Sequence, residues 1–123
     1  MQHLNKYRLA YGWALFIFIL CTANPSSFPD IPFEFTFGKD KIAHFALFGF
    51  QALFIILANL GSNNFKYYIS AFFISSVYGV SIEIIQGLFF ANRSFDYADM
   101  LANTIGAAFV VSFFGTYRLV KQL

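Results

Sequence analysis

The sequence predicts an all-α fold: an integral membrane four-helix bundle with four transmembrane helices and cytoplasmic N- and C-termini. Three observations support this prediction. Of the 123 residues, 59% are hydrophobic and only 11% are charged, whereas soluble domains carry roughly 25% charged residues. A soluble fold of this size cannot hide so much apolar surface from water. Finally, the apolar residues gather in four segments, each near the ~20 residues that cross a bilayer, in one domain over residues 1–123.

The four expected spans are separated by connections of different character. The first connection contains Pro25, Pro29 and Pro32, which resist helix formation. The other two connections are short, so the last three helices are expected to be antiparallel neighbours. The expected spans cover roughly residues 9–23, 41–60, 67–90 and 98–117.

The first apolar segment has two interpretations. Lys6 and Arg8 precede a short apolar core that ends in Cys21-Thr22-Ala23, a pattern also typical of a cleaved signal peptide. Alternatively, Pro25 ends a retained helix at the membrane surface. The sequence leaves open whether residues 1–23 are retained.

Positive charges suggest an orientation. With the N-terminus inside, the cytoplasmic side carries five Lys or Arg residues and the outer side three, a modest positive-inside bias. The inner residues are Lys6, Arg8, Lys66, Arg118 and Lys121, and the outer ones are Lys39, Lys41 and Arg93. The net charge of only +2, without a basic run, gives no reason to expect a nucleic-acid partner.

Each of the last three spans carries a stripe of polar or small residues on one helical face. His44 lies three residues into its expected helix and Glu83 seven residues before Phe90, so both lie within about 10 Å of the outer boundary by the helical rise. We therefore expect a shared polar pocket, with convergence of His44, Glu83, Arg93, Asp99 and Asn103. The stripes comprise Asp40, His44 and Gln51; Ser76, Gly79, Glu83 and Gln86; and Asp96, Asp99, Asn103 and Gly106.

Simpler structural explanations exist for several of these residues. Asp40 and Asp99 suit the first turns of helices, where the dipole favours acids. Lys41 and Arg93 suit snorkelling to lipid headgroups. His44 fits a buried packing position in which its ring nitrogens are hydrogen-bonded. The glycines fit close helix packing. Glu83 is the hardest to explain this way, because a carboxylate within a span costs roughly 2.5–3.5 kcal/mol on insertion scales.

The polar residues form an ordered set of motifs. Asp-Lys-x-x-His opens one helix, Glu-x-x-Gln closes the next, an Arg and Asp-x-x-Asp follow, and Asn-x-x-Gly comes last. The matching residues are Asp40, Lys41 and His44; Glu83 and Gln86; Arg93, Asp96 and Asp99; and Asn103 and Gly106. This set resembles the VanZ-like membrane protein family, and the motif core covers residues 40–109.

The resemblance implies a bacterial multi-pass protein of the cytoplasmic membrane. The family's namesake is associated with resistance to teicoplanin, a lipidated glycopeptide that acts outside that membrane. The resemblance supplies no settled biochemical mechanism. Expected partners are therefore membrane lipids and a lipid-linked envelope precursor or lipoglycopeptide.

Three function classes follow. In the first, a non-catalytic protein binds or shields a lipid-type or lipid-anchored envelope molecule through all nine polar motif residues, with Lys41 and Arg93 meeting an anionic headgroup. In the second, an intramembrane hydrolase or transferase uses His44 and Glu83 as acid and base. The third, a structural subunit or small transporter, lacks a visible inverted repeat. One His with scattered carboxylates matches zinc sites poorly, so neither a metal nor a cofactor is expected.

Overall fold

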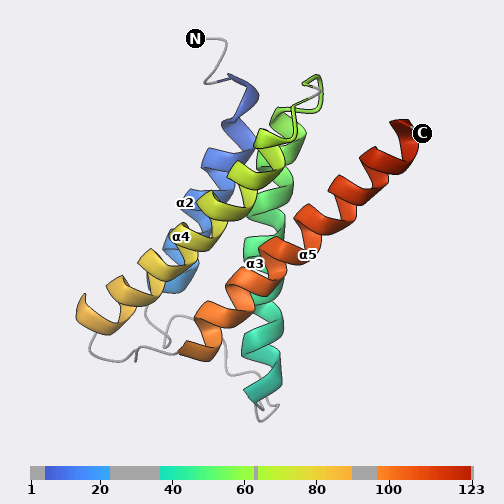
Figure 1. Cartoon of the computed structure of the whole chain (residues 1–123). Coiled ribbons are helices and arrows are strands. Elements are labelled where there is room, and N and C mark those ends of the chain that lie inside the picture. Colours follow the sequence, from blue (N-terminus) through green and yellow to red (C-terminus); the bar gives the residue numbers. More distant parts are fainter. Residues whose placement is uncertain (1–4, 23–36, 63, 90–96, 123) are drawn as a thin grey trace.

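Four α-helices make up the part of the chain that the structure describes. The structure, a computed structural model, describes residues 5–22, 37–62, 64–89 and 97–122, without the side chains of residues 37–40 and 122. The helices are α2 (Arg8–Thr22), α3 (Phe37–Ala58), α4 (Lys66–Phe89) and α5 (Tyr97–Gln122). Successive helices run in opposite directions, so α2 begins and α5 ends at the same end of the bundle (Figure 1).

Three of these helices are long and apolar enough to cross a membrane. The candidate spans are Lys41–Ala58, Lys66–Phe89 and Tyr97–Lys121. The fourth helix, α2, has 15 residues and is therefore about 22 Å long, shorter than a hydrocarbon core of about 30 Å. Large apolar side chains such as Val77 and Phe109 point outward and are 63% and 59% exposed, as expected for surfaces that contact lipid. The expected all-α fold is present, with three long candidate spans and one shorter apolar helix.

Two helix boundaries differ by four or more residues from those expected from hydropathy. α3 begins at Phe37 instead of residue 41, and α5 continues to Gln122 instead of ending at residue 117. The apolar runs mark only the part of a helix that matches hydrocarbon, whereas its charged ends extend further. Asp40 lies in the first turn of α3 and Lys121 in the last turn of α5, where the helix dipole favours an acid and a base respectively.

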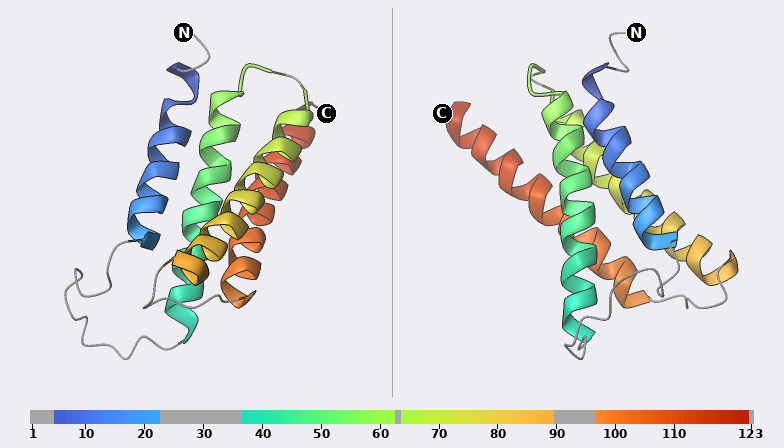
Figure 2. Two further views of the ribbon diagram at one scale, coloured as in Figure 1. Left: turned by 90° about the vertical axis from the view of Figure 1, so that its left-hand side faces the viewer. Right: turned by 180° about the vertical axis from the view of Figure 1, so that it is seen from behind.

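Glycines allow α3 and α5 to cross closely. The backbone of Phe45 on α3 fills the space that a Cβ on Gly106 of α5 would need. A Cβ on Gly49 would lie 3.3 Å from Val110 Cγ2. Close packing at small residues is typical of membrane helices. Beyond this crossing α5 diverges from α3 toward its C-terminal end (Figure 2).

An apolar layer separates the polar site, described below, from the rest of the bundle. It contains Ile17, Cys21, Phe48 and Ile82, and both Phe48 and Ile82 have no exposed surface. Phe48 follows His44 by four residues on the same face of α3, and Ile82 directly precedes Glu83. The polar side chains of α3 and α4 are therefore closed off on one side by packed hydrocarbon.

Polar side chains that reach backbone carbonyls attach the short helix α2 to the bundle. Trp13 Nε1 donates to Leu47 O at 2.8 Å, and Gln51 Nε2 donates to Ala10 O at 3.3 Å. Tyr78 Oη donates to Ala14 O at 2.5 Å. Such interhelical hydrogen bonds stabilise membrane bundles by about 0.6–2 kcal/mol each, so the position of α2 does not depend on apolar packing alone.

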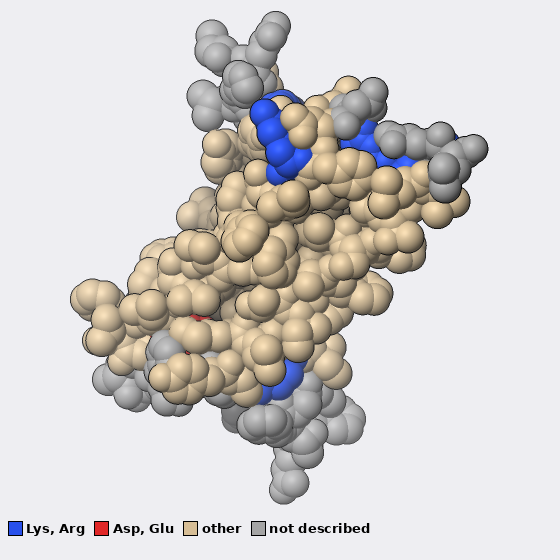
Figure 3. Space-filling model, viewed as in Figure 1, with Lys and Arg blue, Asp and Glu red and all other residues tan. Residues whose placement is uncertain are grey.

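Most of the described Lys and Arg residues lie at the end where α2 begins and α5 ends (Figure 3), and we call it the basic end. Lys6 Nζ and Tyr7 Oη both donate to Asn59 Oδ1 at 3.0 Å. Lys66 and Arg118 lie over tyrosine rings, at 5.3 and 5.8 Å from the ring centroids. Basic and aromatic side chains together are typical of a membrane–water interface. The basic end comprises Lys6, Arg8, Lys66, Arg118 and Lys121.

Candidate functional site

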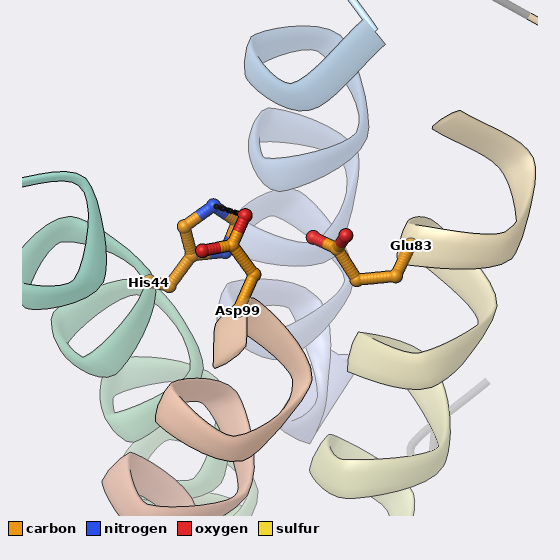
Figure 4. A group of neighbouring side chains, drawn as sticks. All are labelled: His44, Glu83 and Asp99. Atoms are coloured by element: carbon orange, nitrogen blue, oxygen red, sulfur yellow. Dashed lines mark ion pairs between the residues drawn. The ribbon is translucent and has the colours of Figure 1, made fainter. Parts of the chain in front are cut away.

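Three ionisable side chains from three helices point toward one another (Figure 4). They lie nearer the end opposite the basic end, where α3 and α5 begin and α4 ends. They are His44 of α3, Glu83 of α4 and Asp99 of α5, and one ring nitrogen or carboxylate oxygen of each lies within 4.8 Å of the others. All three are buried, and Glu83 has no exposed surface. We call this group the acid–histidine cluster.

The convergence follows from the depth of each residue in its helix. His44 lies seven residues after Phe37, and Glu83 lies six residues before Phe89. Asn103 lies six residues after Tyr97. At the helical rise these offsets correspond to about 9–10.5 Å, so antiparallel packing brings His44, Glu83 and Asn103 to one level. Asp99 lies one turn before Asn103 and approaches His44 from the start of α5. The depth expected for His44 from the sequence was too shallow, because α3 starts earlier than the apolar run.

His44 is oriented by Asn103. The two residues interact through His44 Nδ1 and Asn103 Oδ1 at 2.9 Å, and Asn103 is fully buried. An amide oxygen only accepts hydrogen bonds, so His44 Nδ1 must carry the proton and donate. In the neutral ring, Nε2 then keeps its lone pair. The contact therefore orients the ring so that Nε2 points toward Asp99.

Asp99 bridges a lysine and the histidine. Its Oδ1 accepts from Lys41 Nζ, and its Oδ2 lies 3.5 Å from His44 Nε2. The side chain of Lys41 is only 18% exposed, so this lysine points inward instead of snorkelling. Asp99 also lies in the first turn of α5, where the helix dipole stabilises its negative charge. Asp99 therefore serves both as a first-turn acid of α5 and as a member of the site.

Gln86 contacts the end of α2. It is buried, and its Nε2 donates to Cys21 O at 2.6 Å. Cys21 belongs to the last turn of α2, whose carbonyls lack partners within the helix. Gln86 therefore caps α2 and ties it to α4, whereas the cluster lies one turn away at Glu83.

Three further expected site residues cannot be placed in this cluster. Arg93 and Asp96 lie outside the described residues, and only the backbone of Asp40 is described, in the first turn of α3. The structure thus brings together Lys41, His44, Glu83, Asp99 and Asn103 out of the expected set. Trp13 and Tyr78, which hold α2, were not singled out in the sequence; their signal is a polar aromatic tip within an apolar run.

A cavity of about 440 Å³ lies elsewhere, between α2, α3 and α4. Its wall includes Tyr7 and Asn59 near the basic end and extends to Ala14 and Tyr78. The acid–histidine cluster does not contribute to this wall. The acid–histidine cluster and the cavity between α2, α3 and α4 are therefore separate features.

Comparison with known proteins gives one match. A family model described as VanZ/LLP1 matches residues 4–119, nearly the whole chain. No curated protein and no solved structure matches. The match includes α2, α3, α4, most of α5 and the whole cluster.

Proposed function

The chain belongs to the VanZ/LLP1 family of membrane proteins, and we propose that it is a bacterial cytoplasmic membrane protein whose polar site binds or shields the headgroup of a lipid-type or lipid-anchored envelope molecule. In this proposal the family link to teicoplanin-type resistance reflects binding at that site. The protein holds its ligand without converting it.

The interaction between Lys41 and Asp99 is the observation that carries this proposal. Lys41 lies three residues from His44 on the same helix and is partly exposed at 18%. Lysine is a common partner of phosphate groups, as a point charge. Asp99 holds the ammonium group in place before a ligand arrives. The apolar outer faces of the helices allow the ligand's hydrocarbon chains to remain in the bilayer.

We further propose that α2 also crosses the membrane, that the basic end is cytoplasmic and that the cluster lies on the outer-leaflet side. Five of the described basic residues lie at that end, as the positive-inside rule requires. A helix shorter than the bilayer core is accommodated by local thinning and snorkelling flanks, and Lys6 and Arg8 flank α2 at its start. The site then opens where a lipoglycopeptide or a lipid-linked precursor is present.

Binding to nanodiscs tests the proposal. A long-chain isoprenyl phosphate should bind at least about tenfold more tightly than the matching isoprenol, because one charge-assisted contact contributes about 1.5–3 kcal/mol. Lys41→Gln should remove this preference, whereas Lys66→Gln at the basic end should keep it. Equal binding of phosphate and alcohol by the wild-type protein would refute the anionic headgroup. Teicoplanin with and without its acyl chain provides a parallel comparison.

A second candidate function is supported by the acid–histidine cluster. His44 and Glu83 lie close enough to act on one substrate as acid and base in an intramembrane hydrolase or transferase. Turnover distinguishes the two functions: an enzyme releases a product from an isoprenyl phosphate or another lipid ester in single-turnover assays, and a conservative change at His44 abolishes that release. A binding protein returns the ligand unchanged.

A further inference from the structure

We propose that His44, Glu83 and Asp99 bind one divalent transition-metal ion, with Asn103 and Lys41 as outer partners of the ligands. This inference does not depend on which molecule the site holds. It rests on five observations: the donor atoms of the cluster, their spacing, the hydrogen bonds that orient two of the three donors, the buried amide of Asn103 and the charge balance.

The donor atoms are of the right kind. One imidazole nitrogen and two carboxylates from three different helices face a common space. Such a mixed nitrogen and oxygen set suits Zn²⁺, Mn²⁺ or Fe²⁺, and three protein ligands leave a position open for water or a headgroup oxygen. Because the ligands come from separate helices, the sequence shows no short ligand spacing.

The distances also fit a shared ion. His44 Nε2 and Asp99 Oδ2 lie 3.5 Å apart, which exceeds a normal N–H···O hydrogen bond of about 2.7–3.2 Å. Two ligands at about 2.0–2.1 Å from one tetrahedral ion lie about 3.3–3.5 Å apart. All donor atoms of the cluster lie within 4.8 Å of one another, and at that limit rotamer changes must shorten a separation by about 1.3–1.5 Å to reach the same geometry.

Two of the three donor side chains are oriented by a hydrogen bond through the atom that would not bind the ion, as metal ligands usually are. His44 donates its other ring N–H to Asn103 Oδ1, which leaves Nε2 as the ligating atom. Asp99 uses Oδ1 for Lys41, which leaves Oδ2 directed at His44. These contacts orient both donors before an ion binds.

Asn103 provides an independent observation. It is fully buried, and its Nδ2 has no hydrogen-bond partner among the residues that the structure describes. Buried polar atoms are rarely left unpartnered. This amide nitrogen faces α4 at Gly79, one helical turn from Glu83. A hydroxide on the ion, or an oxygen of a bound headgroup, is an acceptor of the kind that this nitrogen requires.

Charge balance favours the same conclusion. Two carboxylates lie within 4.8 Å of each other inside a membrane protein, and like charges at this distance oppose joint ionisation. A divalent ion between them stabilises both ionised groups at once. It also adds positive charge beside Lys41, where we propose that an anionic headgroup binds.

Metal titration of the full-length protein, purified without a polyhistidine tag and stripped with a chelator, tests the proposal. We expect one Zn²⁺ or Co²⁺ per chain and visible Co²⁺ absorption bands of a low-coordinate site. His44→Ala, Glu83→Gln and Asp99→Asn should each weaken binding at least about 100-fold, and Asn103→Ala about 10–100-fold. His3→Ala, which removes the other histidine of the sequence, should bind like the wild type. Wild-type binding weaker than about 100 μM, or unchanged binding in His44→Ala, would overturn the site.

X-ray absorption of the Zn²⁺-loaded wild-type protein keeps the test valid if the variants do not fold. One imidazole and otherwise oxygen ligands would support the site. No imidazole, or a sulfur ligand from Cys21, would overturn it. Lys41→Gln separates this proposal from the proposed function, because it should abolish the preference for phosphate, whereas the loss of an outer partner should weaken metal binding only about 10–100-fold and keep the stoichiometry of one ion per chain. Loss of the preference without metal binding in the wild type would leave the headgroup site standing and the metal site refuted.

Discussion

Gly79 on α4 lies directly against Asn103 on α5. A Cβ at position 79 would lie 2.9 Å from Asn103 Cβ and 3.0 Å from its Nδ2, closer than side chains pack. Because Asn103 Oδ1 also orients His44, the absence of a side chain at Gly79 sets the position of a histidine on a third helix.

Gly79→Ala should therefore damage the site through Asn103. Overpacking of this kind costs about 1–3 kcal/mol, and the displaced Asn103 should release His44. Thermal unfolding in detergent measures the first effect, and binding at the site measures the second. Gly12→Ala is the matched control, because its Cβ meets nothing within 4 Å; it should be neutral or stabilising by up to about 1 kcal/mol. Equal stability of the two variants would contradict this packing.

Gly106→Ala should be more harmful than Gly79→Ala. The new Cβ would overlap the backbone of Phe45, and a backbone moves less readily than a flexible side chain. We expect α3 and α5 to separate and the protein to lose more than about 3 kcal/mol of stability or to fail to accumulate. Gly115→Ala on the same helix makes only an ordinary contact at 3.8 Å with Tyr68 and should accumulate normally. Normal accumulation of Gly106→Ala would contradict the close crossing.

Glu83→Gln separates a structural role of Glu83 from a functional one. Glutamine keeps the size and hydrogen-bonding capacity but removes the charge. We expect insertion and folding close to wild type, with ligand or metal binding reduced by at least about tenfold. Glu83→Leu, the control for a structural role, should reduce protein level instead. A well-expressed Glu83→Gln variant with full lipoglycopeptide tolerance and full binding would show that the charge is dispensable.

Gln86→Leu should loosen α2 and leave the cluster intact. The lost hydrogen bond to Cys21 O contributes about 0.6–2 kcal/mol. Trp13, the single tryptophan of the chain, lies on α2 and reports its docking, so quenching by a brominated detergent should increase. Ser81→Ala on α4 removes a bond only to Val77 O of its own helix and should leave quenching unchanged. A loss of metal binding in Gln86→Leu with unchanged quenching would instead assign Gln86 to the site.

Cysteine labelling tests the proposed orientation. In a Cys21→Ser background, an impermeant maleimide should label Ser62→Cys only from the cytoplasm, because residue 62 connects α3 and α4 at the basic end. Ser27→Cys and Ser94→Cys should be labelled from outside. Labelling of positions 27 and 94 only from the cytoplasm would reverse the orientation.

The sequence predicted the helices well because hydropathy and proline positions act locally. It placed His44, Glu83, Asp99 and Asn103 on stripes of similar depth, which antiparallel packing turned into a cluster. It did not predict that Lys41 turns inward to Asp99. A lysine near a helix end can extend outward to the lipid headgroups or turn inward to an acidic partner. Which direction it takes depends on whether another helix supplies that partner.

Glu83 and Gln86 contact different helices, and the sequence did not predict this difference either. Both lie on one face of α4, three residues apart, and the sequence treats them alike. About 60° of rotation around the helix axis separates them, which is enough to direct Glu83 toward α3 and α5 and Gln86 toward the end of α2. Helical periodicity identifies a polar face but does not say which neighbour each side chain meets.

The bonds that hold α2 have a consequence for how this helix tolerates substitution. Its three acceptors are the carbonyls of Ala10, Ala14 and Cys21, along one side of the helix. Every residue type supplies a carbonyl, so for these three bonds the chemical information lies in the donors on α3 and α4, whereas in the bond to Leu47 O the donor is Trp13 of α2 itself. What α2 must preserve is side-chain size, since a bulky residue at these positions would block the approaching donor. In a mutational scan, α2 should therefore accept small residues of any polarity at these three positions, whereas each donor position should accept only side chains that still reach and donate.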